Sequence, residues 1–286
     1  MQNNHVGKKH FSMPVIGQIV KHSILILFST IAIFPILVIV VNSFKSRSAI
    51  FQNPYMLPSG ETFDLIGYIT VFERSHFLLY YVNSLIVSVM SLFLILFLGS
   101  MVAHALSEYD FRLNNFVLLF FMAGIIIPVR LASVSLLKIM LTLNLTNTLL
   151  ALIIVYCVQG MPLAIFILIQ FYNKIPKSVK EAARIEGANE WKIYTLIMPL
   201  VKPAIATVAA FSIVPIWNDI WFPLILAPGD KVCTVTMGAQ KFLGQFANDW
   251  NALLAALSMA IVPIIILYFI FSKNIMGGIV DGAVKE

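Results

Sequence analysis

Residues 149–192 read LLALIIVYCVQGMPLAIFILIQFYNKIPKSVKEAARIEGANEWK, an apolar run without charge followed by a stretch dense in charge. The first part, 149–171, is long enough to cross the roughly 30 Å hydrocarbon core of a bilayer as a helix. Within positions 174–192, eight side chains are Asp, Glu, Lys or Arg, in a chain that is only 11% charged. The stretch therefore predicts a membrane span that leads into a loop facing water or a partner.

The composition of the chain indicates a membrane protein. Of its 286 residues 60% are hydrophobic, and its mean hydropathy is +0.92, whereas soluble domains are about 45–50% apolar and about 25% charged. The two cysteines, Cys157 and Cys233, are too few to indicate a disulfide framework or a metal site. The net charge of +6 resides in loops between apolar runs, which favours a role in membrane orientation over nucleic-acid binding.

The apolar runs predict an all-α integral membrane protein with six transmembrane helices. Strand-like alternation is absent, which excludes a β-barrel. The basic N-terminal residues followed by an apolar run resemble a signal peptide, but the run is long enough to be a retained first span. We expect segment 1–23 to precede a six-helix domain, 24–271, and segment 272–286 to follow it. The predicted spans are 24–41, 84–106, 116–137, 149–171, 204–225 and 253–271.

The distribution of Lys and Arg predicts the orientation of the chain. With a cytoplasmic N-terminus, twelve of the 19 basic residues fall on the cytoplasmic side and seven on the other. Cytoplasmic loops are enriched in Lys and Arg, so both termini are expected in the cytoplasm. Six of the twelve lie in the loop 173–203 between the fourth and fifth spans, which is therefore also predicted to be cytoplasmic.

This loop has the pattern of two short helices joined at a glycine. Pro176 suits the first position of a helix, where a missing N–H costs nothing. Gly187 can adopt the left-handed conformation that commonly ends a helix. Asn189 can cap the second helix, which Pro199 and Pro203 are expected to interrupt before the fifth span.

The first of these helices is expected to present a flat face. Val179, Ala182, Ala183 and Glu186 share one side at helical spacing, and the two alanines would let another backbone approach closely. Glu181 is placed to form ion pairs with Lys177 and with Arg184, each worth at most about 1 kcal/mol when exposed.

The second helix carries more apolar surface than a free loop should show to water. Two alternatives follow from the pattern alone. The loop could lie on lipid headgroups as an amphipathic segment, or it could dock against a soluble partner. The apolar residues are Trp191, Ile193, Tyr194, Leu196 and Ile197.

A resemblance favours the second alternative. Glu181-Ala182-Ala183, three residues and then Gly187 resemble the EAA motif of binding-protein-dependent ABC transporter permeases. In that family the motif forms the coupling helix, which sits in a cleft of the cytoplasmic ATPase subunit. Here Ile197 is followed directly by Met198-Pro199, one residue short of the usual I-x-L-P. The coupling residues that the resemblance implies are Glu181, Ala182, Ala183, Arg184, Gly187, Ala188 and Trp191.

Four further segments, in the right order between the predicted spans, resemble the carbohydrate branch of this family, the maltose-permease-like proteins. They are YVNSL at 81–85, NLTNT at 144–148, WND at 217–219 followed by PLI at 223–225, and the C-terminal GAVKE at 282–286, where the family has G-A-V-K-G.

The resemblance implies a subunit of an ATP-driven sugar or oligosaccharide importer in the bacterial plasma membrane. Its implied partners are a second homologous permease, two ATPase subunits, an extracytoplasmic sugar-binding protein and membrane lipid, with no nucleic acid. The sequence contains no H-E-x-x-H, G-x-x-x-x-G-K or G-x-S-x-G pattern, so we expect no catalysis and no cofactor on this chain. ATP and Mg²⁺ would bind the partner ATPase.

Several polar residues within the apolar spans have open alternatives. Asp219, with Asn218, could line a sugar path, or it could form a structural hydrogen bond to a loop. Asn83 could line the path or cap the second span. Arg130 is expected to reach the headgroups, and His104 is expected to pack rather than relay protons.

Two other classes remain open. A secondary transporter would carry internal repeats and several buried ionisable groups, and the sequence offers no clear repeat and only Asp219. A membrane scaffold would need no polar path.

Overall fold

The computed structural model describes residues 15–244 and 248–283. Parts of the predicted segment 1–23 and of the C-terminal GAVKE therefore lie outside the described residues. The described chain is helical, with isolated β-bridges only. Its α-helices are α1 Val15–Asn42, α2 Arg47–Gln52, α3 Ile66–Arg74, α4 Phe77–Glu108, α5 Asn114–Ile126, α6 Ser133–Thr142, α7 Leu149–Tyr172, α8 Lys177–Ile185, α9 Glu190–Ile197, α10 Lys202–Asn218, α11 Trp221–Leu226, α12 Val235–Gln240 and α13 Trp250–Ala283, with 3₁₀ turns η1 Val129–Ala132, η2 Met198–Val201 and η3 Asp230–Val232.

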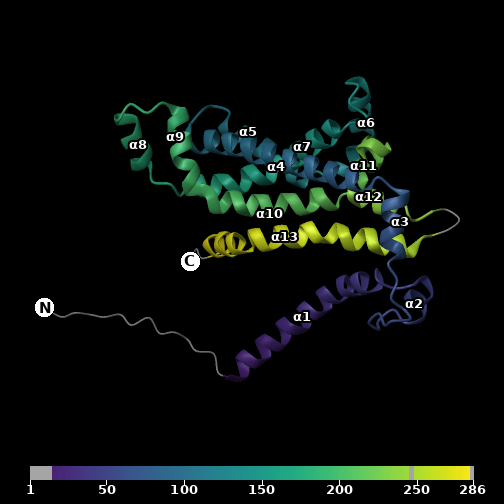
Figure 1. Cartoon of the computed structure of the whole chain (residues 1–286). Helices are drawn as coiled ribbons and strands as arrows, with labels where there is room; N and C mark the ends of the chain where they lie inside the picture. Colours follow the sequence, from purple (N-terminus) through teal and green to yellow (C-terminus); the bar gives the residue numbers. More distant parts are fainter. Residues whose placement is uncertain (1–14, 245–247, 284–286) are drawn as a thin grey trace.

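The side chains that the structure describes end at Phe269 and leave out Ile16 and Tyr268. Five helical segments are long and apolar enough to cross a membrane: α1, α4, α7, α13 and the continuous segment formed by α9, η2 and α10. The bent pair formed by α5 and the η1–α6 segment makes a sixth candidate span. The predicted all-α membrane fold is therefore confirmed. In Figure 1, α4, α7, α10 and α13 run roughly side by side, and α8 and α9 lie at one end of this bundle. We call this end the loop end and the other, which carries α6, α11 and α12, the far end.

The third predicted span, 116–137, is wrong as a single helix. The chain bends by 87° between α5 and the η1–α6 segment. Pro128 lies at the break and accounts for it. A proline cannot donate the backbone hydrogen bond of a continuing helix, and it disfavours the helical conformation in the residue before it. The break places Arg130 on the 3₁₀ turn rather than in the middle of a span.

Other boundaries also differ from the prediction. The first span begins at Val15, and the second begins at Phe77, ahead of the expected positions 24 and 84. The fifth span ends at Asn218, and a separate short helix, α11, follows it instead of a continuation to 225. The boundaries differ because helices can extend beyond the apolar runs, and composition alone does not indicate the residue at which a helix begins or ends.

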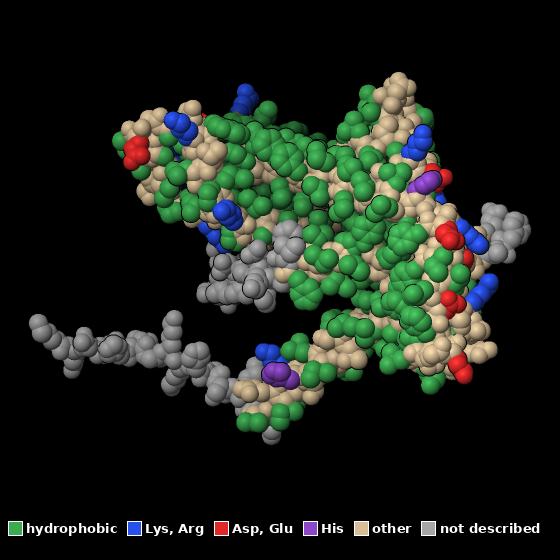
Figure 2. Space-filling view, viewed as in Figure 1, with side chains coloured by type: hydrophobic (Ala, Val, Ile, Leu, Met, Phe, Trp, Pro, Cys, Tyr) green, Lys and Arg blue, Asp and Glu red, His purple; other side chains and the backbone are tan. Residues whose placement is uncertain are grey.

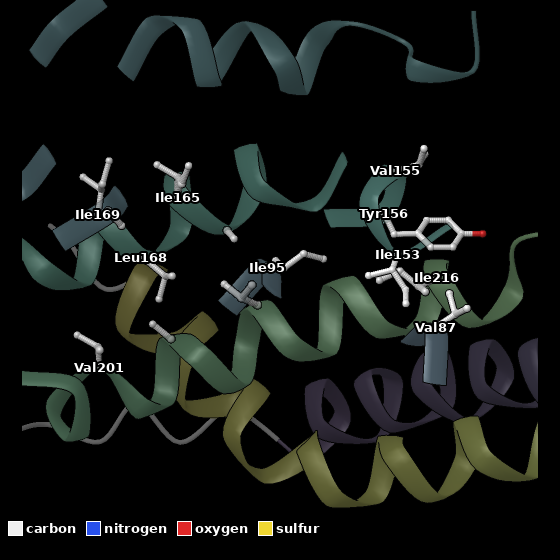
Figure 3. Close-up of a cluster of buried hydrophobic side chains, with 14 of the residues drawn as sticks. Val87, Ile95, Ile153, Val155, Tyr156, Ile165, Leu168, Ile169, Val201 and Ile216 are labelled. Carbon is white, nitrogen blue, oxygen red and sulfur yellow. The ribbon is translucent and has the colours of Figure 1, made fainter. Parts of the chain in front are cut away.

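The core of the bundle lies between α4, α7 and α10. Figure 3 shows part of this cluster, in which Ile95 of α4 faces Ile165 and Leu168 of α7. Two glycines allow the close approach: Gly99 lies against Ala164, and a side chain at Gly160 would overlap Ile95. Membrane helices associate through close packing of this kind, because lipid offers no hydrophobic driving force between them.

α1 is set apart from the other spans. None of the residues in its most apolar window is buried, whereas 56% of the corresponding window of α7 is buried. Figure 1 shows α1 diverging from the bundle below α13. In the space-filling view hydrophobic side chains cover the middle of the bundle and charged ones gather toward its two ends, as expected for a protein surrounded by lipid.

The NLTNT stretch forms the tight connection between α6 and α7. Asn144 and Asn147 have φ values of 54° and 59°, which asparagine tolerates better than most residues. The Asn147 side chain accepts a hydrogen bond from the backbone N–H of Gly229 at 2.8 Å, and Thr148 caps α7 by accepting from Ala151 N at 3.2 Å. The connection therefore fastens the start of α7 to the segment that follows α11.

Candidate functional site

The loop after α7 folds as two short helices joined at Gly187, as the sequence predicts. Gly187 has a φ of +80°, in the left-handed region. Its N–H donates to Arg184 O at 3.0 Å, and Ala188 N donates to Ala183 O at 2.9 Å. These two bonds satisfy carbonyls at the end of α8 in the manner of a Schellman motif. The glycine therefore ends α8 and redirects the chain.

The second helix of the loop, α9, leads directly into the fifth span. Asn189 caps it, since its Oδ1 accepts from Lys192 N at 2.9 Å, as predicted. Pro199 lies in η2, which changes the helix locally to a 3₁₀ turn before α10 begins at Lys202. The missing residue before Pro199 thus leaves a continuous helical path, and no flexible loop separates α9 from the span.

The flat face expected on α8 is not available to a partner as a whole. Ala183 is only 7% exposed and packs into the core of the bundle, whereas Ala182 is exposed. The outward surface instead contains Glu181 and Ile185, whose side chain is 87% exposed. Trp191 on α9 is 55% exposed. Ile185 was missed because an isoleucine at the end of a short helix gives no signal in sequence that distinguishes a docking residue from a packed one.

Arg184 does not pair with Glu181 as predicted. Its guanidinium contacts Glu108 at 2.6 Å and Glu190 at 3.1 Å. Glu108, the last residue of α4, also accepts from Lys180 at 2.5 Å. The Glu108 and Lys180 side chains are 8% and 5% exposed. We refer to these four residues, Glu108, Lys180, Arg184 and Glu190, as the Glu108 network.

The Glu108 network joins α8 and α9 to the end of α4. Two hydroxyl contacts add to it: the Tyr109 hydroxyl donates to Glu190 at 2.7 Å, and Ser100 and Tyr194 share a hydrogen bond of 2.6 Å. Burial and the bond to Glu190 raise the pKa of Tyr109 to about 12, so its phenol remains a donor at neutral pH. Sequence reasoning missed Glu108, because its partners lie more than seventy positions away along the chain.

His104 packs beside this network, as expected. It is 6% exposed, and its ring lies among those of Tyr109, Tyr172 and Tyr194 at 5.4–6.3 Å between centroids. Neither ring nitrogen has a hydrogen-bond partner among the described residues.

At the far end, Asp219 is the centre of a second polar cluster. It follows the last residue of α10, and its carboxylate accepts from the backbone N–H groups of Trp221 at 3.2 Å and Phe222 at 3.1 Å. The Tyr156 hydroxyl donates to it at 2.8 Å. These bonds hold the start of α11 against α7. They are structural hydrogen bonds, of the kind given above as the alternative to a role of Asp219 in a sugar path.

Arg130 belongs to the same cluster. Its guanidinium lies 3.5 Å from Asp219 Oδ1, and the side chain is 67% exposed. The expected extension of Arg130 toward the headgroups stays a prediction, and the structure adds an acidic partner for its guanidinium. We refer to Arg130, Tyr156 and Asp219 as the Asp219 cluster. It borders a cavity of about 170 Å³.

The two asparagines proposed for a sugar path do not border this cavity. Asn83 is 3% exposed, and its amide donates to Lys231 O and Cys233 O, both at 3.0 Å. It lies inside α4, so it does not cap that helix either. Asn218 is exposed at the end of α10. Of the three predicted path residues, only Asp219 lines the cavity.

Comparison with known proteins then identifies the family. Residues 95–280, which include the loop and both polar clusters, match the family described as "Binding-protein-dependent transport system inner membrane component". The chain belongs to this family. The predicted resemblance is thus confirmed, and the protein is a multi-pass permease of the inner membrane.

Similar proteins support the same assignment. The chain is 32% identical over 93% of its length to the diacetylchitobiose uptake system permease protein NgcG of Streptomyces coelicolor, covering 88% of that protein. It is 33% identical over 89% of its length to the arabinooligosaccharides transport system permease protein AraQ of Halalkalibacterium halodurans, covering 92% of that protein. One chain of a bacterial ABC transporter involved in the import of the acidic polysaccharide alginate has the same fold, with a TM-score of 0.77 at 22% identity over 90% of this permease and 96% of that chain.

Proposed function

We propose that this permease is a transmembrane subunit of an ATP-driven importer for a sugar or oligosaccharide, and that its α8–α9 loop receives the motion of a separate ATPase. The observation that carries the proposal is the attachment of the loop. α8 is fixed to α4 by the Glu108 network, and α9 continues into α10. A displacement of α8 is therefore passed to two spans at once. The carbohydrate relatives support the cargo class.

The outward surface of the loop would contact the ATPase. Glu181, Ala182, Ile185 and Trp191 are exposed around the turn at Gly187. A large apolar side chain at a tip rimmed by polar residues is typical of a protein–protein contact rather than of a free loop. Ala183, Arg184 and Ala188 would act from within the loop, by packing or by ion pairing, rather than by direct contact.

The complete importer would contain a second homologous permease, two ATPase subunits that bind ATP and Mg²⁺, and an extracytoplasmic sugar-binding protein. The loop end would face the cytoplasm, together with both termini. Figure 1 supports this arrangement, because α1 begins and α13 ends toward the end of the bundle that carries α8 and α9. Closure of the ATPases would then drive alternating access between the two permeases.

Copurification tests the docking surface. We expect Ile185→Glu to reduce the amount of ATPase that copurifies with the tagged permease in detergent, because a charge would replace an apolar contact. Leu57→Glu is the matched control, since Leu57 is 77% exposed in the segment between α2 and α3. Equal ATPase recovery from the two variants would contradict the proposed docking surface.

Uptake measurements test the energy source. Cells that retain a proton gradient but have been depleted of ATP should lose saccharide uptake. Uptake that continues under these conditions would show that the chain is a secondary transporter instead.

A further inference from the structure

The cavity beside the Asp219 cluster lies where two interrupted spans meet. Its wall includes Arg130 from the break between α5 and α6, and Asp219 from the break between α10 and α11. α7 contributes Tyr156 and Gln159, and α10 contributes Ser212. Figure 3 shows Ile95, Tyr156 and Ile216, which also line it. The cavity is thus built from three spans and from both helix breaks.

The polar groups of the cavity have unused hydrogen-bonding capacity. Gln159 and Ser212 form no side-chain hydrogen bond to any residue within the described ranges, and Gln159 is exposed. Among residues 15–244 and 248–283, the Arg130 guanidinium contacts only Asp219, which leaves most of its five N–H donors free. Polar groups at membrane depth are costly, and they are commonly found where they face water or a transported solute.

Asp219 differs from the other groups because its oxygens are already occupied. Oδ2 accepts from Tyr156 and Phe222, and Oδ1 accepts from Trp221 and lies beside Arg130. Its side chain is 7% exposed. Asp219 therefore orients Arg130 and neutralises its charge, whereas Arg130 and Gln159 have groups left to offer.

We propose that Arg130, Gln159 and Ser212 bind the hydroxyl groups of a neutral saccharide during its passage, with Asp219 as a positioning residue. This site rests on the proposed sugar-import function. Amide, guanidinium and hydroxyl groups match the donors and acceptors of a polyol, and the Arg130–Asp219 pair has no net charge that would select an acidic sugar. The ring of Phe211, which is 50% exposed at the cavity, offers an apolar surface for a sugar ring.

The volume of the cavity indicates that it holds only part of a ligand. Binding pockets for small molecules are commonly about 300–1,000 Å³, and this cavity measures about 170 Å³. A saccharide passing between two permeases would touch each of them on one side, and this chain would supply one half of the contacts.

Thiol labelling of the assembled importer tests the site directly. The variants are Gln159→Cys and Gln170→Cys, whose positions lie about three turns apart on the same face of α7, or about 17 Å along its axis. Gln170 is exposed and lies away from the cavity. The probe is whichever of raffinose, stachyose, arabinotriose and diacetylchitobiose the unmutated importer takes up fastest. It should slow the reaction of a charged methanethiosulfonate with Gln159→Cys at least threefold and leave Gln170→Cys unchanged.

Transport supplies the second measurement. At saturating saccharide, Gln159→Leu should lower the uptake rate about three- to tenfold, the size expected for one lost hydrogen bond, and Gln170→Leu should transport at the unmutated rate. Normal uptake by Gln159→Leu together with unprotected Gln159→Cys would overturn the site and leave the import function standing. If the unmutated importer takes up none of the four saccharides, the proposed cargo class and this site fall together.

Discussion

The two ends of the bundle each carry a buried carboxylate beside an arginine, but the two arrangements differ. Glu108 and Asp219 have similarly small exposed fractions, 8% and 7%. Glu108 contacts two cations, at 2.5 and 2.6 Å, and one of them, Lys180, is itself buried. Asp219 accepts mainly from neutral donors, and its arginine lies at 3.5 Å and is largely exposed. A carboxylate beside an arginine thus belongs to a buried network of ion pairs at the loop end, and to an open surface with unused hydrogen-bond donors at the far end.

The largest loss of stability is expected from a change in the Glu108 network. Glu108→Gln removes the only carboxylate that Lys180 contacts in the described structure, so a buried ammonium is left uncompensated. Breaking a buried ion pair from one side costs about 3–5 kcal/mol. We expect the apparent melting temperature in detergent to fall clearly. Unfolding can be measured with a thiol-reactive dye that reports exposure of the buried Cys157 and Cys233. Uptake should fall further than ATP hydrolysis does, because α8 loses its attachment to α4.

The control for this change is Glu186→Gln, since Glu186 is exposed and belongs to no ion pair among residues 15–244 and 248–283. The double variant Glu108→Gln/Lys180→Met should recover part of the lost stability by removing the uncompensated charge. If Glu108→Gln melts at the same temperature as Glu186→Gln, the Glu108 network does not stabilise the attachment of α8 to α4.

The contrast between the two ends also shows what sequence can predict. Local signals identified the loop, because the conformations of Gly187 and Asn189 depend on their immediate neighbours. The apolar runs identified the spans for the same reason. The partners of Glu108 and of Arg130 could not be read in this way, since each pair joins segments far apart in the chain and depends on how the helices pack. The hydrogen bonds of Asn83 were not predicted for the same reason, because they are made to carbonyls at Lys231 and Cys233.

A substitution of Gly187, at the loop end, is expected to have an intermediate effect on the coupling of uptake to ATP hydrolysis. A side chain there would meet no atom within 4 Å, so Gly187→Ala adds only the strain of a left-handed backbone at φ +80°, about 1–2 kcal/mol. We expect uptake per ATP hydrolysed to decrease, because the end of α8 is displaced relative to the ATPase. Gly60→Ala is the matched control: Gly60 also has open space around it, but its φ is not positive. Equal coupling in the two variants would show that the turn geometry is dispensable.

The smallest effect is expected at the far end, where a neutral hydrogen bond between two side chains joins the helix breaks beside the Arg130–Asp219 contact. Trp221 Nε1 donates to the Ser133 hydroxyl at 2.8 Å, and this hydroxyl in turn donates to Arg130 O at 2.5 Å. Trp221→Phe keeps most of the ring and loses one bond, so it should destabilise the protein by about 0.5–1.5 kcal/mol. Ser133→Ala loses both bonds and should cost somewhat more. Because the two residues share one bond, the double variant should be less destabilised than the sum of the single changes. Strict additivity in detergent unfolding would mean that Trp221 and Ser133 do not interact.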